Sequence, residues 1–451
     1  MKAAKIGIED VKFSDRISYL SDDLLFRILS LVPITDAVNT SILSKRWTSV
    51  WKMMPMLVYD ANSCPSRSFL NFFRRSLELH ETPVLQTLTL KLKLRDCSDS
   101  LQLPSSFPNT VFQYLVVLKL YTMVCHGFTD KSSVCFRSLK SLNLTFVSFL
   151  DQESFCMLMS ACPVLDDLFW DSVAIRLSSL FPACDSLFTI SIPSLERLEI
   201  KDYTPVQSHQ SHESRFKINA PSLKYLKINY NSFGRFEISS AMPNLVEATL
   251  RVDPSQTDKP LIFLTPVKFL SIHLYVTEVL LLADKISQRL LRLELCIYGK
   301  ISRNLLLHLL KHSPKLQVLK LREIRYSTQV LNKSPRVLEF KDPPLSFPDP
   351  SSVPECLSFH LTTFEWRCYR GTEEEKEFII YILQNAACLK TAVISVYSEG
   401  RRFGEKELLW IKELESVPKA STSCQLVIRL TSRVNLPRIS VVDLPRKLHF
   451  M

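Results

Sequence analysis

The chain has 451 residues, of which 46% are hydrophobic, and its formal net charge at pH 7 is +11. This composition supplies enough apolar material for sizeable cores and excludes a disordered chain, and the length suits about three domains. Only 7 glycines occur, and no G-x-G-x-x-G or G-x-x-x-x-G-K-[ST] loop can be written from them. Because such loops need glycine for close approach to a phosphate, the sequence argues against a P-loop or Rossmann nucleotide enzyme.

The first residues, MKAAKIGIEDVKF, contain no apolar run long enough for a signal peptide. No stretch approaches the roughly 18 apolar residues of a membrane span. We therefore expect a protein of the nucleus or cytoplasm, with its 12 cysteines as reduced thiols. The cysteines form no C-x-x-C pair, so neither a zinc site nor a disulfide framework is expected, and we expect no metal or cofactor.

The basic charge admits two interpretations. A net charge of +11 can attract nucleic acid or an anionic surface. The basic residues, however, alternate with leucine in strand-like runs and form no long block, which favours a solvated sheet face. A basic repeat scaffold that binds nucleic acid or a phosphorylated ligand remains the alternative. A hydrolase is disfavoured because the sequence has no G-x-S-x-G motif.

Residues 15–51 carry the densest helical pattern of the chain. Ser21 is expected to cap a first helix with its hydroxyl, and Pro33 is expected to end it. A short helix around Asp36 to Thr40 and a third from about Ser44 to Lys52 follow. Three short helices bury too little surface to cover the apolar side chains present, which indicates a partner. The apolar face of the first helix comprises Leu24, Leu25, Ile28, Leu29 and Val32.

This segment resembles an F-box. The likeness rests on Asp15-Arg16-Ile17-Ser18, Asp22-Asp23-Leu24-Leu25, Ile28-Leu29-Ser30 and Leu43-Ser44-Lys45-Arg46-Trp47. The family usually has Leu-Pro where this chain has Leu20-Ser21, which replaces a rigid proline by a hydroxyl and bears on the strength of partner binding. The resemblance implies docking on the Skp-type adaptor of a cullin-RING ubiquitin ligase. By position in the motif, the residues that would bind the adaptor are Leu20, Asp22, Leu24, Leu25, Ile28, Leu29, Val38, Leu43, Lys45 and Trp47.

A Leu-x-x-Leu-x-Leu pattern recurs from residue 83. Its second and third apolar positions are two residues apart and therefore point to one face of a strand. The pattern resembles the leucine-rich repeat, whose units of about 20–29 residues must stack to close a core. Asp151 and Ser302 are expected to cap helices between strands, and 201–219 is expected to form a loop. The first positions of the clear copies are Leu85, Leu115, Leu139, Leu165, Leu195, Leu223, Leu245, Val267, Leu290 and Leu316.

A last module follows a proline-rich stretch, 332–354, which we interpret as an extended connection. Leu361, Phe364 and Trp366 repeat the strand pattern, and Thr372 with Glu375 forms a capping box for a helix. Further alternation predicts strands near 389–396 and 424–430 and a helix near 405–414. This stretch resembles the FBD domain that follows F-box and leucine-rich repeats in plant proteins, and we expect it to end the solenoid. The matching text is Ser352-Val353-Pro354-Glu355-Cys356-Leu357, Phe364-Glu365-Trp366, Glu373-Glu374-Glu375-Lys376 and Ala420-Ser421-Thr422-Ser423-Cys424-Gln425-Leu426.

Other polar clusters have plainer explanations. His308 and His312 have a metal-binding spacing on a helix, but no H-E-x-x-H motif is completed, so a solvated helix face is favoured. His209 and His212 lie in a polar stretch expected to be a surface loop. The three glutamates from Glu373 to Glu375 are explained by the helix dipole at a first turn rather than by acid–base chemistry.

The sequence thus predicts an α/β chain: a leucine-rich-repeat solenoid with a curved parallel sheet, preceded by a three-helix F-box and ended by an FBD-like module. The resemblances imply a non-catalytic substrate-recognition adaptor of an SCF-type ubiquitin ligase, whose repeats bind an unidentified target protein. The predicted boundaries are 14–55 for the F-box, 56–82 for a helical transition, 83–345 for the repeats, 346–431 for the FBD-like module and 432–451 for a tail.

Overall fold

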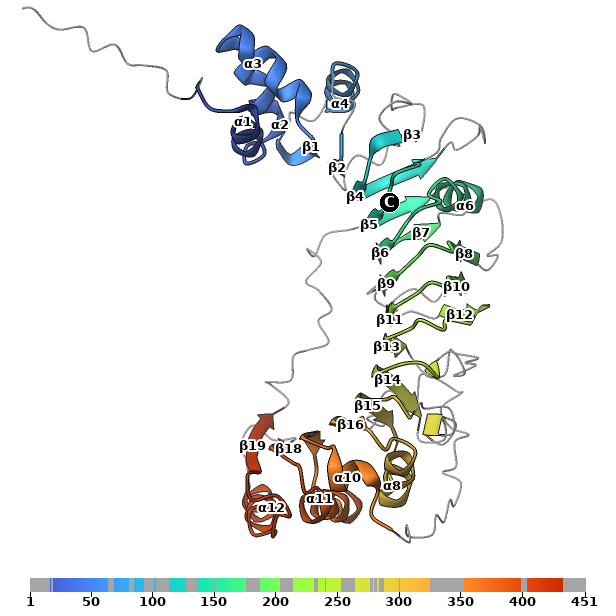
Figure 1. Ribbon diagram of the computed structural model, residues 1–451, viewed down its shortest axis with the longest axis vertical. Helices are drawn as coiled ribbons and strands as arrows, with labels where there is room; N and C mark the ends of the chain where they lie inside the picture. The colour runs from blue at the N-terminus through green and yellow to red at the C-terminus, as the bar shows by residue number, and fades with distance from the viewer. Residues whose placement is uncertain are drawn as a thin grey trace, which may run out of the picture. The chain divides into compact units, whose positions relative to one another are not determined.

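The chain divides into two compact units, Met1–Leu139 and Lys140–Met451. Among the described residues, no helix is long and apolar enough to cross a membrane. The computed structural model (Figure 1) describes residues 17, 19–63, 69–80, 85–92, 101–102, 113–126, 136–149, 151–175, 187–202, 214–230, 234–239, 241–252, 264–275, 279, 282–283, 288–299, 301–324, 352–398 and 404–432.

The first unit begins with a small helical module. The first helix ends at Leu29, before the proline that was expected to end it, and Pro33 stands at the N-cap of the second helix. Ser21 occupies the N-cap of the first helix with an extended backbone, but its hydroxyl makes no capping hydrogen bond, so that prediction was wrong. Asp22 instead pairs with Arg46, whose Nη2 lies 2.7 Å from its Oδ1. The elements are α1 (Asp22–Leu29), α2 (Ile34–Asn39), η1 (Thr40–Ile42), α3 (Lys45–Val50), η2 (Trp51–Met53) and η3 (Ala61–Ser63).

A parallel sheet starts directly after this module. β1 pairs with β2 and β2 with β4, while β3 pairs with the end of β4. The predicted helical transition over 56–82 therefore opens with a strand, which the sequence reasoning missed. Leu57 and Tyr59 are fully buried, and the Tyr59 hydroxyl lies 2.9 Å from that of Ser76 on α4. The elements are β1 (Met56–Asp60), α4 (Phe69–Glu78), β2 (Thr87–Lys91), β3 (Leu101–Gln102) and β4 (Val117–His126).

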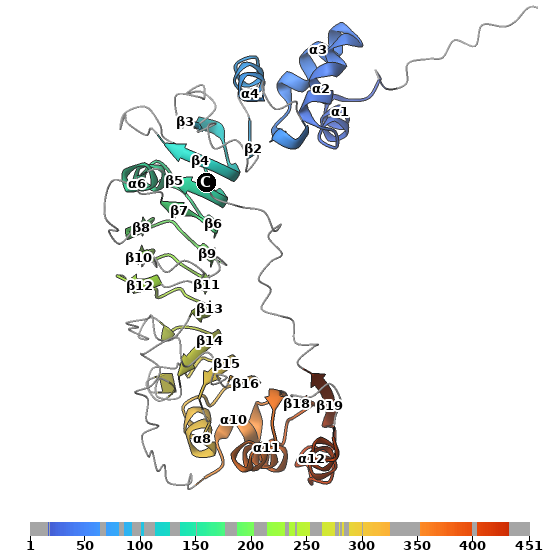
Figure 2. The same cartoon turned by 180° about the vertical axis from the view of Figure 1, so that it is seen from behind.

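The second unit contains a long parallel sheet, whose strands follow one another in chain order (Figures 1 and 2). Each repeat places its apolar residues in register with those of its neighbours, as Leu293 pairs with Leu319 and Leu295 with Leu321. These positions are buried, which confirms the predicted inward face. The strands are β5 (Ser141–Phe149), β6 (Asp167–Asp171), β9 (Arg197–Asp202), β11 (Tyr225–Tyr230), β13 (Glu247–Val252), β14 (Phe269–Tyr275), β15 (Arg292–Tyr298), β16 (Val318–Ile324), β17 (Thr363–Tyr369), β18 (Thr391–Ser398) and β19 (Gln425–Ser432), with β7 (Ala174–Ile175) beside β5.

A second, three-stranded sheet forms the return limb of the middle repeats. Its order is β12 (Gly234–Ile238), β10 (Ser214–Asn219) and β8 (Leu187–Ser191). Phe188, Phe216 and Phe236 stack across it, with ring centroids 5.1 and 4.8 Å apart. The loop predicted over 201–219 was therefore wrong at both ends, because 201–202 belong to β9 and 214–219 form β10. Phe216 and Ile218 alternate with polar residues, the period of a half-buried strand.

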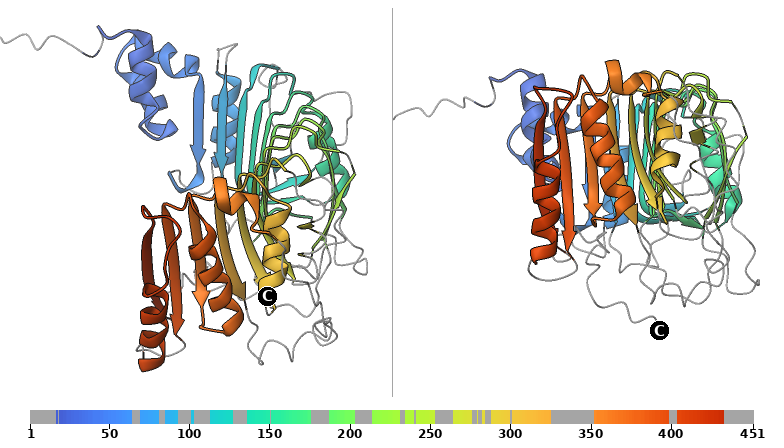
Figure 3. Two further views of the ribbon diagram at one scale, coloured as in Figure 1. Left: turned by 60° about the horizontal axis from the view of Figure 1, so that its bottom comes forward. Right: turned by 90° about the horizontal axis from the view of Figure 1, so that it is seen from below.

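Helices cover one face of the sheet from β15 to β19, as Figure 3 shows.

Two helix caps were predicted in this unit. Asp151 caps α6 as predicted, accepting a hydrogen bond from the Ser154 amide over 2.6 Å. Ser302 makes no capping bond to α8, and the Arg303 amide donates instead to Glu374 on α11 over 3.2 Å. The helices of this unit whose bounds lie in the described residues are α6 (Gln152–Ser160), α8 (Arg303–Lys311), α10 (Glu355–Phe359), α11 (Glu373–Asn385) and α12 (Glu405–Glu415).

The last module continues the sheet of the repeats without a break in pairing. β17 pairs with β16 so that Phe364 meets Leu319 and Trp366 meets Leu321. The capping box of Thr372 and Glu375 is confirmed at the start of α11. Residues 332–351 of the predicted connection and 433–451 of the tail lie outside the described residues.

Candidate protein-interaction surfaces

The helical module has a small interior of its own. Leu25 is fully buried, Leu29 is 3% exposed and Trp47 is 5% exposed. Side chains with so little accessible surface pack the module from within and have almost nothing to offer a partner. Of the ten residues predicted to contact an adaptor, these three lie inside the module and would act by packing beneath its surface.

The outer side of α1 is apolar as well. Leu24 and Ile28 lie one helical turn apart and are 46% and 42% exposed, and Leu43 is 64% exposed after η1. Asp22 and Lys45 are also exposed, while Leu20 and Val38 are half-buried. The structure thus leaves seven of the ten predicted residues at least partly accessible. The apolar stripe of α1 serves two purposes, since alternate members face inward and outward.

Three further exposed residues escaped the sequence reasoning. Tyr19, Leu31 and Ile42 are 85%, 85% and 88% exposed, more than any apolar residue that was predicted. Leu31 lies in the turn after α1, beyond the C-cap Ser30, so helical spacing within α1 could not have indicated it. We call Leu24, Ile28, Leu31, Ile42 and Leu43 the exposed apolar set. So much exposed apolar surface on one small module marks an interaction site.

Arg46 fixes the start of α1 against α3. Its guanidinium donates to the carboxylate of Asp22 and to the backbone carbonyl of Leu20. Both partners of the ion pair are substantially exposed, so we expect it to contribute less than about 1 kcal/mol to stability. The main effect of Arg46 is to fix the position of the Leu20 backbone just before α1.

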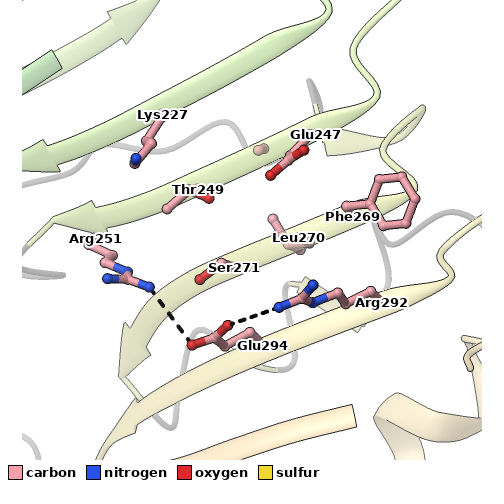
Figure 4. A pocket seen from close by; sticks show the side chains of 10 residues that line it. Lys227, Glu247, Thr249, Arg251, Phe269, Leu270, Ser271, Arg292 and Glu294 are labelled. Atoms are coloured by element: carbon pink, nitrogen blue, oxygen red, sulfur yellow. Dashed lines mark ion pairs between the residues drawn. The ribbon is translucent and has the colours of Figure 1, made fainter. Parts of the chain in front are cut away.

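The outward face of the second unit's sheet is the other candidate surface. A pocket of about 520 Å³ lies on β11, β13, β14 and β15. Figure 4 shows its Thr249 and Ser271 side chains between charged ones. Glu294 lies 3.8 Å from both Arg251 and Arg292 and 3.2 Å from Arg367. Three arginines of this face therefore share one carboxylate, that of Glu294.

Charged hydrogen bonds hold the glutamates of this face in their ionised form. Burial alone would raise the pKa of Glu365, but hydrogen bonds from Arg367 and Lys320 hold it below its usual value. In the same way, hydrogen bonds from Lys201 and Lys227 hold the pKa of Glu199 below its usual value despite burial. The face is thus a permanently charged network at neutral pH.

Comparison with known proteins agrees with this arrangement. The F-box domain family matches residues 17–59, the LRR repeats of an FBD-associated F-box protein match 75–257, and the FBD family matches 349–394. A putative F-box/FBD/LRR-repeat protein of Arabidopsis thaliana is 49% identical over 95% of this chain and 100% of its own length. A putative FBD-associated F-box protein of the same plant is 43% identical over 95% of this chain and 98% of its own length.

The chain belongs to the F-box/FBD/LRR-repeat proteins. The helical module with the exposed apolar set is thus its F-box, a domain that in general binds Skp-type adaptors. The FBD match covers α10, β17, α11 and the first strand residues of β18. In this F-box/FBD/LRR-repeat protein, the FBD is therefore built into the sheet of the repeats.

The two histidine pairs are the remaining polar candidates of the sequence. His308 and His312 lie on and just after α8, and a ring nitrogen of His312 lies 2.9 Å from the His308 carbonyl oxygen. No cluster of three or more His, Cys, Asp or Glu side chains within the described ranges could hold a metal ion. His209 and His212 lie outside the described residues.

Several thiols of the F-box/FBD/LRR-repeat protein are held in their neutral form. Burial raises the pKa of Cys125 and of Cys356 to about 12 and that of Cys296 to about 11. A thiol needs its ionised form to act as a nucleophile, so these three are poor candidates for covalent chemistry.

Proposed function

We propose that this F-box/FBD/LRR-repeat protein is the substrate-recognition adaptor of an SCF-type (Skp-cullin-F-box) E3 ubiquitin ligase in the nucleus or cytoplasm. The F-box would dock on the Skp-type adaptor, and the repeats would hold a target protein. The exposed apolar set on the F-box carries the proposal. Apolar side chains between 42% and 88% exposed on a small module gain most by burial against a partner.

The chain itself would supply no catalytic group. Ubiquitin transfer would be the chemistry of the ligase, accelerated because the target is held near the charged ubiquitin. Burial raises the pKa values of Cys125, Cys296 and Cys356, so these three thiols are poorly suited to form a thioester, which needs a thiolate.

The experiment is affinity purification of the tagged chain from plant cells in which the ligase is inactivated, so that captured targets persist. We expect a Skp-type adaptor and a cullin to co-purify with the wild-type chain. Leu24→Asp with Ile28→Asp should abolish both, because two carboxylates would enter an apolar contact, while target proteins remain bound.

Leu408→Asp with Leu409→Asp provides the matched control, because these leucines are also exposed on a helix, α12, at 50% and 59%. The control should keep the adaptor and the cullin. Co-purification of the adaptor with the Leu24→Asp, Ile28→Asp chain at wild-type levels would overturn the proposal.

A further inference from the structure

The outward face of the sheet from β9 to β17 is basic. Strand side chains alternate between the two faces, so the residues between the buried leucines point outward. Outward positions of these strands carry eight cationic and four anionic side chains. The cations are Arg197, Lys201, Lys227, Arg251, Arg292, Lys320, Arg322 and Arg367, and the anions are Glu199, Glu247, Glu294 and Glu365.

Three of these arginines have uncommitted donors. Arg251 and Arg292 approach Glu294 only at 3.8 Å, which is an ion pair but too long for a hydrogen bond. Arg322 lies between Cys296 and Arg367 in register, and its Nε is buried without a hydrogen-bond partner. Within the described part of the chain, Arg322 has no carboxylate partner. A partly buried guanidinium of this kind gains from an incoming anion.

The pocket gives such an anion a place to bind. Thr249 and Ser271 are small, so the face is hollowed above them, and their hydroxyls are additional donors. Arg251 and Arg292 flank this hollow, and the half-exposed ring of Phe269 lies at its rim (Figure 4). A carboxylate seated over the two hydroxyls would be within reach of both arginines.

We propose that this arginine face binds an extended acidic segment of a target protein, with one carboxylate in the pocket and a second at Arg322. The proposal rests on the proposed function only in taking the ligand to be the target. Neighbouring strands lie about 4.8 Å apart, which places Arg322 on the order of 12 Å from the pocket. At about 3.3 Å per residue, the two carboxylates would be three or four residues apart in the segment.

The interleaved glutamates favour a peptide over nucleic acid. A nucleic-acid backbone carries phosphates at short, regular intervals and would meet Glu247, Glu294 and Glu365 as well as the arginines. A peptide with spaced carboxylates meets fewer of these glutamates, because only one of its charges enters the pocket, where Glu247 and Glu294 lie beside Lys227, Arg251 and Arg292. Glutamates of this kind therefore select for the spacing of an acidic ligand.

The test is fluorescence anisotropy with the purified full chain and a labelled 12-residue peptide, (Glu-Gly-Ser)4, against (Gln-Gly-Ser)4 at low salt. We expect binding of the glutamate peptide that weakens with salt, and no binding of the glutamine peptide. Arg292→Gln with Arg322→Gln should weaken binding at least tenfold. Lys311→Gln with Lys412→Gln removes the same charge from exposed positions on α8 and α12 and should leave binding unchanged.

Equal binding by the wild-type and arginine-substituted chains, or an equal loss in both substituted chains, would overturn the proposal. Tighter binding of a 12-nucleotide single-stranded DNA, lost on the same arginine substitutions, would make the face a nucleic-acid surface and also overturn it. Unfolding midpoints of the substituted chains confirm that they are folded. Adaptor binding by the F-box is measured in a separate experiment. A negative result with the peptide therefore leaves the proposed function untouched, and a negative result with the adaptor leaves the peptide proposal untouched.

Discussion

Replacing Trp366 by alanine tests whether the FBD and the repeats form one cooperative structure. The Trp366 side chain is fully buried, lies in register with Leu321 of the last repeat and Ile394 of β18, and has its ring 5.9 Å from that of Phe378. Truncating such a residue removes the transfer free energy of the ring and leaves a cavity, which costs about 3–5 kcal/mol. Because the ring touches both sides of the junction, we expect both to be destabilised.

Native-state hydrogen exchange read by mass spectrometry measures this directly. The free energy of opening should fall by a similar amount for peptides from β15 and β16 and for peptides from β17 and β18. Trp410→Ala on α12 is the control, because that side chain is only half-buried and should affect the module alone. Wild-type protection of β15 and β16 in the Trp366→Ala chain would refute the reasoning and make the FBD an independent domain.

Three further predictions concern the same module. Gly371→Ala should lower the free energy of unfolding by at least about 1–2 kcal/mol, because φ is +70° at this residue and the new Cβ would lie 2.1 Å from the Trp410 ring. Gly404→Ala is the control, because its new Cβ would lie 3.3 Å from the nearest atom. It should lower the free energy of unfolding much less in the same series of denaturation curves. Burial raises the pKa of Glu375 above its usual 4.5, so the ionised folded state is penalised above that pH. Glu375→Gln should therefore gain stability relative to wild type as the pH rises from 4.5 to about 7.5, and denaturation curves showing the opposite trend would contradict this. Deletion of 351–451 should expose the apolar layer of β16 and cause aggregation, whereas a monomeric truncated chain with an unchanged unfolding midpoint would show that the module is separable.

The regular part of the fold could be predicted from the sequence because each repeat carries its own local signal. Leu293 with Leu295, and Leu319 with Leu321, alternate on one strand face and are buried as expected. The strand β1 was missed because its copy of the pattern is degenerate: Met54, Leu57 and Tyr59 keep the spacing and are buried, but only one of them is leucine. Its strand character depends on pairing with β2, a long-range contact.

The candidate docking site was only half predictable for a similar reason. Helical spacing assigns Leu24, Leu25, Ile28 and Leu29 to one broad apolar stripe, but it cannot say which members face α3. Only the fold separates buried Leu25 and Leu29 from exposed Leu24 and Ile28. That Arg322 has no carboxylate partner among the described residues likewise depends on neighbours from other repeats, which the sequence does not place.

The helix caps also show that a sequence pattern predicts local contacts but not contacts between distant residues. Asp151 and Thr372 cap their helices through residues three positions away, which a sequence pattern contains. Ser302 was expected to do the same for α8. The Arg303 amide at the start of that helix instead donates a hydrogen bond to the carboxylate of Glu374, 71 residues later in the chain. A distant carboxylate thus replaces the local hydroxyl.

The most direct test of the account is the binding of the purified full chain to a purified Skp-type adaptor, measured by isothermal titration calorimetry. We expect a one-to-one complex for the wild-type chain and for the Leu408→Asp, Leu409→Asp control. We expect at least a 100-fold loss of affinity for Leu24→Asp with Ile28→Asp, since desolvating each unpaired carboxylate costs about 2 kcal/mol or more. Equal affinity of the wild-type and the Leu24→Asp, Ile28→Asp chains would contradict the claim that the exposed apolar set is the docking site.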